Sequence, residues 1–81
     1  MNLDLITEFL VKSVVKEKDM VSVKQYEEDE LITIEVLASK DDMPSLIGKQ
    51  GVIAKAIRTL VIASACTQEN HKTIKVNFNS I

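Results

Sequence analysis

The chain contains only two glycines among its 81 residues, and both lie within one four-residue segment. That segment ends the run Ile47-Gly48-Lys49-Gln50-Gly51, which falls between a very short and a long helix-forming stretch. Glycine tolerates backbone conformations that other residues avoid, and without a Cβ atom it lets an external group approach the main chain closely. The spacing therefore predicts a tight connection between two helices, with its backbone open to a ligand.

Hydrophobic periodicity predicts three helices and three strands around this connection. The helices are expected at 2–16, from about 41–45 to Ile47, and at about 51–66, and the strands at 20–26, 31–38 and 72–78. In this order, α-β-β-α-α-β, the first two strands should form an antiparallel hairpin. The return through two helices makes a right-handed crossover, so strands 31–38 and 72–78 should be parallel. We expect a single α+β domain over residues 1–81, a three-stranded mixed sheet with three helices packed on one face.

The apolar positions of the helices predict which side chains enter the core. In the first helix these positions are Leu3, Ile6, Leu10 and Val14, with Phe9 nearby. In the long helix, the expected core arc contains Ile53, Ile57, Leu60, Val61 and Ser64. Phe9 and Phe78 are assigned to the core rather than to a surface on which bases stack. An acid, Asp41 or Asp42, is expected to cap the short helix, with Pro44 in its first turn.

Charge is distributed unevenly along a chain whose net charge is only −2. Residues 1–42 hold eleven acids and five bases, whereas residues 43–81 hold one acid and five bases. This asymmetry indicates one acidic and one basic face, or else chance clustering of solvated charges. Cys66 is alone, no apolar run is long enough for a membrane helix, and the first residues lack the pattern of a secretory signal. A cytoplasmic location is therefore expected.

Residues 48–51, here called the glycine loop, carry the chemistry needed to hold a nucleic-acid backbone. The free N–H groups and positive dipole end of the following helix favour a phosphate. Lys49 and Gln50 add a charge and a hydrogen bond at the tip. Lys55 and Arg58, three apart on one arc, are candidates for backbone contacts or else ordinary solvated side chains. Ile47, Ala54 and the last strand should form the groove floor, with Lys75 at its rim. A G-x-x-G match alone is weak evidence for a nucleic-acid-binding loop. The predicted β-β-α order before the match and α-β order after it strengthen that evidence.

A third arc of the long helix carries no charge and has mostly small side chains. Its residues, here called the uncharged stripe, are Val52, Ala56, Thr59 and Ala63. Small side chains allow a second helix to approach closely, so the stripe is a candidate interface for a dimer or a partner. The alternatives are that it packs against the N-terminal helix or is scattered exposed surface, which is common in soluble proteins.

The run from Asp41 to Leu60, and above all IGKQG followed by AKAIRTL, resembles the small bacterial single-KH proteins of the KhpA (YlqC) type. The resemblance extends over nearly the whole chain. It implies a type II KH fold, cytoplasmic binding of single-stranded RNA, and association with itself or with a second KH-containing protein of the KhpB/Jag type. It further implies post-transcriptional regulation or RNA chaperone activity linked to cell envelope growth and division. The chain departs from the family in having Pro44-Ser45 where Gly-Lys is usual and Val52 where a base is common, which predicts weaker RNA binding.

Catalytic and metal-binding patterns are lacking. Cys66 and His71 have no third group to orient them, and one Cys with one His does not make a four-ligand zinc site. The glycine loop does not fit the Walker A pattern. We therefore expect a binding protein without cofactor or metal rather than an enzyme. Two hypotheses remain, an RNA-binding KH module and a KH-fold dimerisation module with little direct RNA binding.

Overall fold

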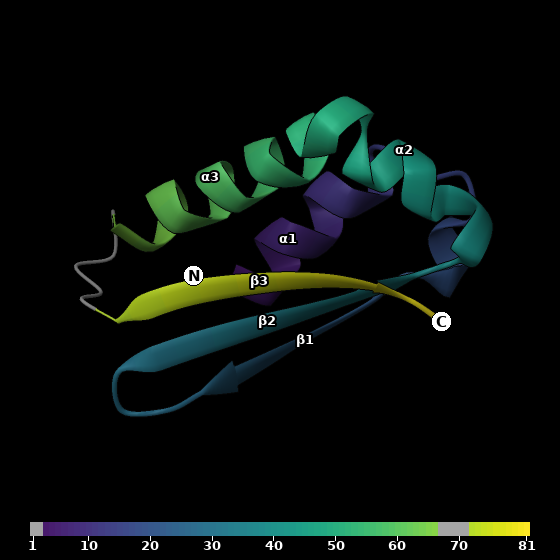
Figure 1. Ribbon diagram of the computed structural model, residues 1–81. Helices are drawn as coiled ribbons and strands as arrows, with labels where there is room; N and C mark the ends of the chain where they lie inside the picture. Colours follow the sequence, from purple (N-terminus) through teal and green to yellow (C-terminus); the bar gives the residue numbers. More distant parts are fainter. Residues whose placement is uncertain (1–2, 67–71) are drawn as a thin grey trace.

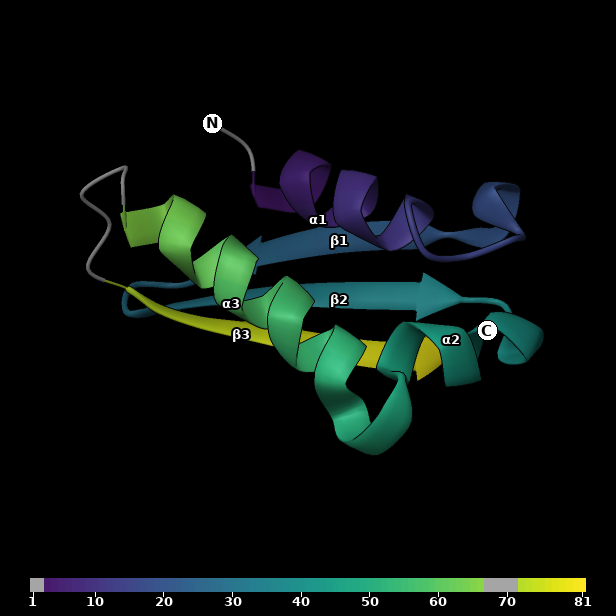
Figure 2. The same cartoon turned by 90° about the horizontal axis from the view of Figure 1, so that it is seen from above.

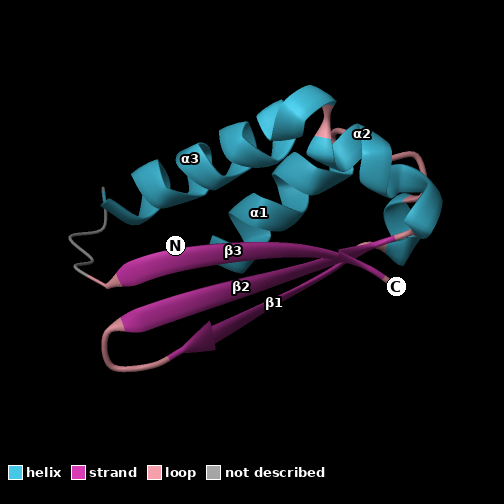
Figure 3. Ribbon diagram, viewed as in Figure 1, coloured by secondary structure: helices cyan, strands magenta, loops and turns pink. Residues whose placement is uncertain are grey.

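A three-stranded sheet carries all the α-helices on one of its faces in the computed structural model (Figure 1, Figure 3). The structure describes residues 3–66 and 72–81. Its elements in chain order are α1 (Leu3–Lys12), η1 (Lys18–Met20), β1 (Ser22–Glu27), β2 (Leu31–Ala38), η2 (Lys40–Asp42), α2 (Met43–Ile47), η3 (Lys49–Gly51), α3 (Val52–Cys66) and β3 (Thr73–Ser80). The α+β class and the order α-β-β-α-α-β are confirmed. The loop expected at 67–71, including His71, lies outside the described residues.

The sheet has the order β1-β2-β3, with β2 in the centre. β1 pairs with β2 in antiparallel fashion, and β2 pairs with β3 in parallel fashion from Leu31↔Thr73 to Ala38↔Ser80. The parallel pair confirms the crossover inferred from the two intervening helices. Alternate residues of β2, namely Ile32, Ile34, Val36 and Ala38, are buried beneath the helices. The residues between them lie on the sheet face that no helix covers.

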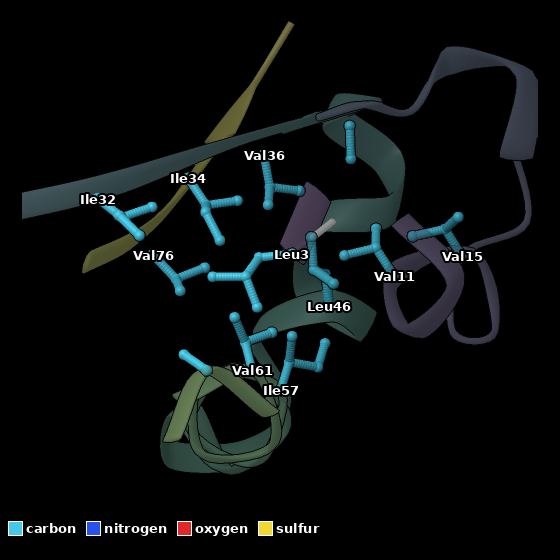
Figure 4. Packing of buried hydrophobic residues seen from close by; sticks show 12 residues of the cluster. Leu3, Val11, Val15, Ile32, Ile34, Val36, Leu46, Ile57, Val61 and Val76 are labelled. Carbon is cyan, nitrogen blue, oxygen red and sulfur yellow. The ribbon is translucent and has the colours of Figure 1, made fainter. Parts of the chain in front are cut away.

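The core lies between the sheet and the helices. Seen from above, α1 lies over β1, and α3 runs obliquely across the other two strands (Figure 2). Figure 4 shows the buried side chains meeting in this layer: Leu3, Val11, Val15, Ile32, Ile34, Val36, Ala38, Leu46, Ile57, Val61, Ala65 and Val76. Each large aliphatic side chain buried here contributes about 1.5–3 kcal/mol of transfer free energy. The one buried leucine of α2, Leu46, fixes the start of the glycine loop to this core.

Both core-facing helices are rotated relative to the predicted faces. In α1 the buried positions are Leu3, Thr7 and Val11, and the helix ends at Lys12, earlier than expected. Thr7 fits there because its hydroxyl donates a 2.8 Å hydrogen bond to Leu3 O. Phe9 is 72% exposed, so its assignment to the core was wrong. It lies two residues from Thr7 and Val11, about 200° around the helix from each.

In α3 the buried positions are Ala54, Ile57, Val61 and Ala65. Leu60 is 52% exposed, so its assignment to the core was also wrong. It lies about 100° around the helix from the fully buried Val61. Because the small side chains of Ala54 and Ala65 bring this arc close to the sheet, the larger leucine is left at the edge of the contact.

Asp42 connects the turn that follows α1 to the start of α2, although the sequence suggested a helix cap. Its carboxylate accepts hydrogen bonds from Lys16 N at 3.0 Å, Glu17 N at 2.9 Å and Ser39 Oγ at 3.0 Å. It makes no capping bond to α2, and Ser39 Oγ instead accepts from Asp42 N. The residue is only 3% exposed. The N–H groups of Lys16 and Glu17 hold the pKa of Asp42 below its ordinary value of 3.8.

Candidate nucleic-acid interface

The glycine loop reverses the chain through left-handed backbone conformations. Gly48 has φ 75° and ψ 179°, Gln50 has φ 57° and ψ 26°, and Gly51 has φ 76°. A glutamine in the left-handed region is strained, and such strain gathers at functional sites. Gly48 N donates to Pro44 O at 2.9 Å and Gly51 N donates to Gly48 O at 3.3 Å. Lys49 and Gln50, at the tip of the loop, are both exposed.

The two glycines are required for different reasons. A Cβ atom on Gly48 would overlap with Ile53 Cγ1 and lie 3.1 Å from both Cβ and N of Ile53. The first turn of α3 therefore packs directly against Gly48, and the sequence did not single out Ile53 for this role. A Cβ on Gly51 would meet nothing nearer than Lys55 Cε at 3.9 Å, so only the backbone conformation favours glycine there. Gly48 thus allows the loop to pack closely on α3, whereas Gly51 supplies the positive φ with which the chain enters α3.

Positive charge gathers beside the loop. α3 begins at Val52, directly after the loop, and its first turn contains no acid. The helix dipole adds partial positive charge at this end. Lys49 is exposed at the loop tip, and the 3.9 Å approach of Lys55 Cε to the Gly51 Cβ position places the Lys55 side chain along the loop. The loop, Lys49 and Lys55 together can receive a phosphate.

The guanidinium of Arg58 contacts β3, although the sequence placed Arg58 with Lys55 as a candidate for backbone contacts. Its Nη2 donates to Val76 O at 3.4 Å, and its guanidinium carbon lies 6.0 Å from the centroid of the Phe78 ring. The side chain therefore extends from α3 to β3, the edge strand of the sheet. Alternating burial along β3 was predicted, with Val76 and Phe78 on the helix side, but their contact with Arg58 was not. That contact joins residues 18 positions apart, which no local sequence signal reports.

The remaining predicted groove residues have different surroundings. Ile47 is half-buried at the end of α2. Ala54 is only 6% exposed, so it supports the groove from beneath rather than lining it openly. Lys75 is exposed and pairs with Thr33 of β2. Because Ile74 and Val76 on either side of it face the helices, Lys75 projects from the opposite face of the sheet. The structure therefore does not bring Lys75 to the glycine loop.

All four residues of the uncharged stripe are exposed on α3. Val52 is 57% exposed, and Thr59 Oγ1 donates to Lys55 O of its own helix at 2.9 Å. The stripe consequently does not pack against α1, which was one of the alternatives. Leu60, exposed at its border, adds a large apolar side chain that the sequence had assigned to the core.

A glycine loop between a short and a long helix, on a mixed sheet with the order α-β-β-α-α-β, defines a type II KH domain. The family model described as KhpA/KhpB, KH domain, matches residues 4–79. The chain belongs to this KhpA/KhpB KH-domain family. Membership agrees with the expectation that the chain is not an enzyme, because the family is defined by a KH domain and its curated relatives are named as RNA-binding proteins.

Among these relatives, the RNA-binding protein KhpA of Clostridium perfringens is 44% identical over 69 residues, covering 85% of this chain and 91% of the relative. KhpA of Listeria monocytogenes serovar 1/2a is 43% identical over 67 residues, covering 83% and 86%. The fold is also similar to that of Era, solved in complex with MgGDPNP and nucleotides 1506–1542 of 16S ribosomal RNA. The TM-score is 0.72 at 16% identity, over 98% of this chain and 30% of the Era chain.

Neither a membrane helix nor a metal cluster is found where the structure can be described. Across residues 3–66 and 72–81, no helix combines the length and apolarity needed to cross a bilayer. The same residues contain no group of three or more His, Cys, Asp or Glu side chains placed to hold a metal ion. The Cys66–His71 pair considered from the sequence includes His71, which lies outside the described residues.

Proposed function

We propose that this chain binds single-stranded RNA through the glycine loop. The observation that carries the proposal is the exposed loop tip of Lys49 and Gln50, with positive φ at Gly48, Gln50 and Gly51, directly in front of the α3 N-terminus. Gly48, Lys49, Gln50 and Gly51 hold the sugar–phosphate backbone, as KH loops do for about four nucleotides. Lys55 adds charge beside them. Ile47 and the helix-facing side of β3 contact bases, with Ala54 as support, and Lys75 takes part only if the strand wraps around the sheet edge.

Membership of the KhpA/KhpB family supports a cellular role that depends on RNA binding. The curated relatives are named as RNA-binding proteins, which is consistent with RNA as the ligand here. We place the chain in the cytoplasm, as a post-transcriptional regulator or RNA chaperone linked to cell envelope growth and division. A second KH-containing protein of the KhpB/Jag type is the expected partner. Pro44-Ser45 and Val52 stand where relatives commonly have glycine or basic residues, so RNA affinity should be modest.

Titration of short single-stranded RNAs at two salt concentrations tests the proposal, using the native chain and a Lys49→Asp, Gln50→Asp variant. Acids at the loop tip repel phosphates, so binding should be salt-sensitive in the native chain and lost in the variant. Both proteins must show the same thermal unfolding, because both altered side chains are exposed. Equal binding by the two proteins, or none by the native chain, would contradict RNA binding through the loop.

A second candidate function is self-association or partner docking through the uncharged stripe. The exposed apolar side chains of Val52 and Leu60 favour it, together with the small side chains of Ala56 between them and Ala63 one turn further along α3. An Ala56→Glu variant should then be monomeric in sedimentation experiments in which the native chain is dimeric. Asn79→Glu adds the same charge to an exposed residue of β3 and should leave the dimer intact. An unchanged sedimentation profile for Ala56→Glu would exclude the stripe as the interface.

A further inference from the structure

The guanidinium of Arg58 is held against β3 rather than beside the glycine loop. Its Nη2 donates to Val76 O at 3.4 Å, and its Cζ atom lies 6.0 Å from the Phe78 ring centroid. Arg58 follows Gly51 by seven residues, which corresponds to about 10 Å along the α3 axis. The proposed groove places bases against the helix-facing side of β3, so a strand whose phosphates are held at the loop can present a base to Arg58.

The bond to Val76 leaves Arg58 able to make a paired contact. A guanidinium has five N–H donors, arranged so that its end edge and its side edge each present two parallel donors. Nη2 carries two hydrogens, one on each edge. Whichever hydrogen Nη2 gives to Val76 O, the other edge keeps both of its donors. The contact with Phe78 restricts the side chain further, so less conformational entropy is lost when a ligand binds.

Two parallel donors recognise a base that offers two adjacent acceptors. Guanine offers O6 and N7, the commonest partners of arginine in nucleic-acid recognition. Cytosine offers N3 and O2 on its Watson–Crick edge, which is free in single-stranded RNA. Adenine and uracil alternate donors with acceptors along the corresponding edges. Two parallel N–H donors at this position therefore distinguish guanine and cytosine from adenine and uracil.

We propose that Arg58 is the base-selecting residue of this KH groove, favouring a nucleotide that presents two adjacent acceptors, guanine or cytosine, at the position facing β3. The inference rests on the proposed function, because it assumes that RNA is held at the glycine loop. It replaces the expectation that Arg58 contacts the backbone with one in which the lysines hold the phosphates and the arginine reads a base.

Fluorescence anisotropy with four RNA octamers tests this selection. Each octamer is oligouridine with one central nucleotide, U, A, C or G, so that the chain can slide until that nucleotide faces Arg58. The native chain should bind the G or the C octamer about 5- to 100-fold more tightly than the U and A octamers, which is the discrimination given by one bidentate contact. Equal affinity for all four octamers would overturn the proposal.

Base analogues identify which acceptors are read without altering the protein. If guanine is preferred, 7-deazaguanine should bind no better than uracil, because N7 is missing, while inosine should retain the preference. If cytosine is preferred, 3-deazacytosine should lose it. A preference that survives removal of these acceptors would show that Arg58 does not read the base through a paired contact.

Arg58→Lys keeps the charge and removes the two parallel N–H donors of the guanidinium. This variant should bind all four octamers within about twofold of the native affinity for the U octamer, since one bidentate contact carries the discrimination. Lys55→Gln is the matched control and should weaken binding to all four octamers equally, leaving the preference intact. A base preference that persists in Arg58→Lys overturns the assignment to Arg58.

Failure of the inference is distinguishable from failure of the proposed function. If the native chain binds all four octamers equally and the Lys49→Asp, Gln50→Asp variant binds none, RNA binding through the loop stands and base selection by Arg58 falls. If the native chain binds none of the octamers, both fall together. If Arg58→Lys shows lower thermal stability, the analogue series on the native chain still decides the outcome.

Discussion

The two ends of α2 are both polar turns, but one is buried within the protein and the other is exposed. At the N-terminal end, the buried Asp42 carboxylate takes up the N–H groups of Lys16 and Glu17, so that junction is satisfied within the protein. At the C-terminal end, the glycine loop exposes Lys49 and Gln50 at its tip, directly before the N-terminus of α3. The first junction orders the fold, and the second presents an exposed loop to a ligand.

This difference shows how a five-residue helix can serve both packing and binding. Leu46 is fully buried between the two junctions, and Asp42 fixes the helix to the turn that follows α1. With one end held in this way, the other end can carry strained left-handed conformations without unfolding. Changes at the Asp42 junction should therefore act on stability, while changes at the tip of the glycine loop should act on binding.

Gly48→Ala should give the largest loss of stability. The new methyl group overlaps with Ile53, and the backbone conformation at this position is strained for any other residue. We expect the free energy of unfolding to fall by about 2–4 kcal/mol, which lowers Tm by roughly 10–25 °C for a domain of this size. Thermal unfolding followed by circular dichroism measures the change. A loss below about 1 kcal/mol would mean that Ile53 moves aside easily.

Asp42→Asn should give the next largest loss of stability. The carboxylate accepts hydrogen bonds from two N–H groups, and in asparagine an NH₂ donor replaces one of the two accepting oxygens. The folded pKa of Asp42 is lowered from 3.8, so its stabilisation is present above pH 3.8 and is lost as pH falls through the lower folded pKa. Urea midpoints should separate native chain and variant at pH 6 and converge at the acid end. Asp41→Asn, at the exposed neighbouring acid, is the control and should leave the midpoint unchanged. A constant separation at every pH would contradict the role of the ionised carboxylate.

Gly51→Ala should destabilise less than either change. Space for a methyl group exists, because the nearest atom is Lys55 Cε at 3.9 Å. Only the left-handed backbone opposes it, which costs about 1–2 kcal/mol for an L residue. Comparison with Gly48→Ala under the same conditions separates backbone strain from steric overlap. Equal losses for the two variants would show that the contact with Ile53 contributes little.

Replacement of Lys49 and Lys55 by Gln should have the smallest effect on stability, within about 0.5 kcal/mol, because both side chains are exposed. RNA binding should nevertheless weaken, and the slope of log affinity against log salt should shrink by about 1.4, or about 0.7 per phosphate contact on single strands. The control variant, Lys24→Gln with Lys40→Gln, removes the same charge from exposed residues outside the loop. If the control changes the slope as much, only net charge matters.

The strands and their order could be predicted because their signal is local. Ile32, Ile34, Val36 and Ala38 alternate strictly, and the handedness of crossovers then determines the parallel pair. The glycine loop was equally readable, since its two glycines mark it directly. The helix faces were less accurate because the large side chains of Phe9 and Leu60 outweighed Thr7, Ala54 and Ala65, whose small size carries little hydrophobic signal although they are buried.

Contacts between residues that are distant in the chain could not be predicted from the sequence. The bonds of Asp42 to Lys16 and Glu17 join positions 26 and 25 residues apart, and the bond from Arg58 to Val76 spans 18. Each depends on how helices settle on the sheet rather than on a neighbouring residue type. The same holds for Lys75, which is basic but projects from the opposite face of the sheet.

Amide chemical shifts of the ¹⁵N-labelled chain, followed during titration with a short single-stranded RNA, test most directly whether the glycine loop is the ligand site. The amides of residues 48–52 should shift most, because bound phosphates would lie against the loop, while those of Lys16 and Glu17, which Asp42 holds at the other end of α2, should stay constant. Saturable shifts confined to other parts of the chain, such as the uncovered face of the sheet, would contradict the account.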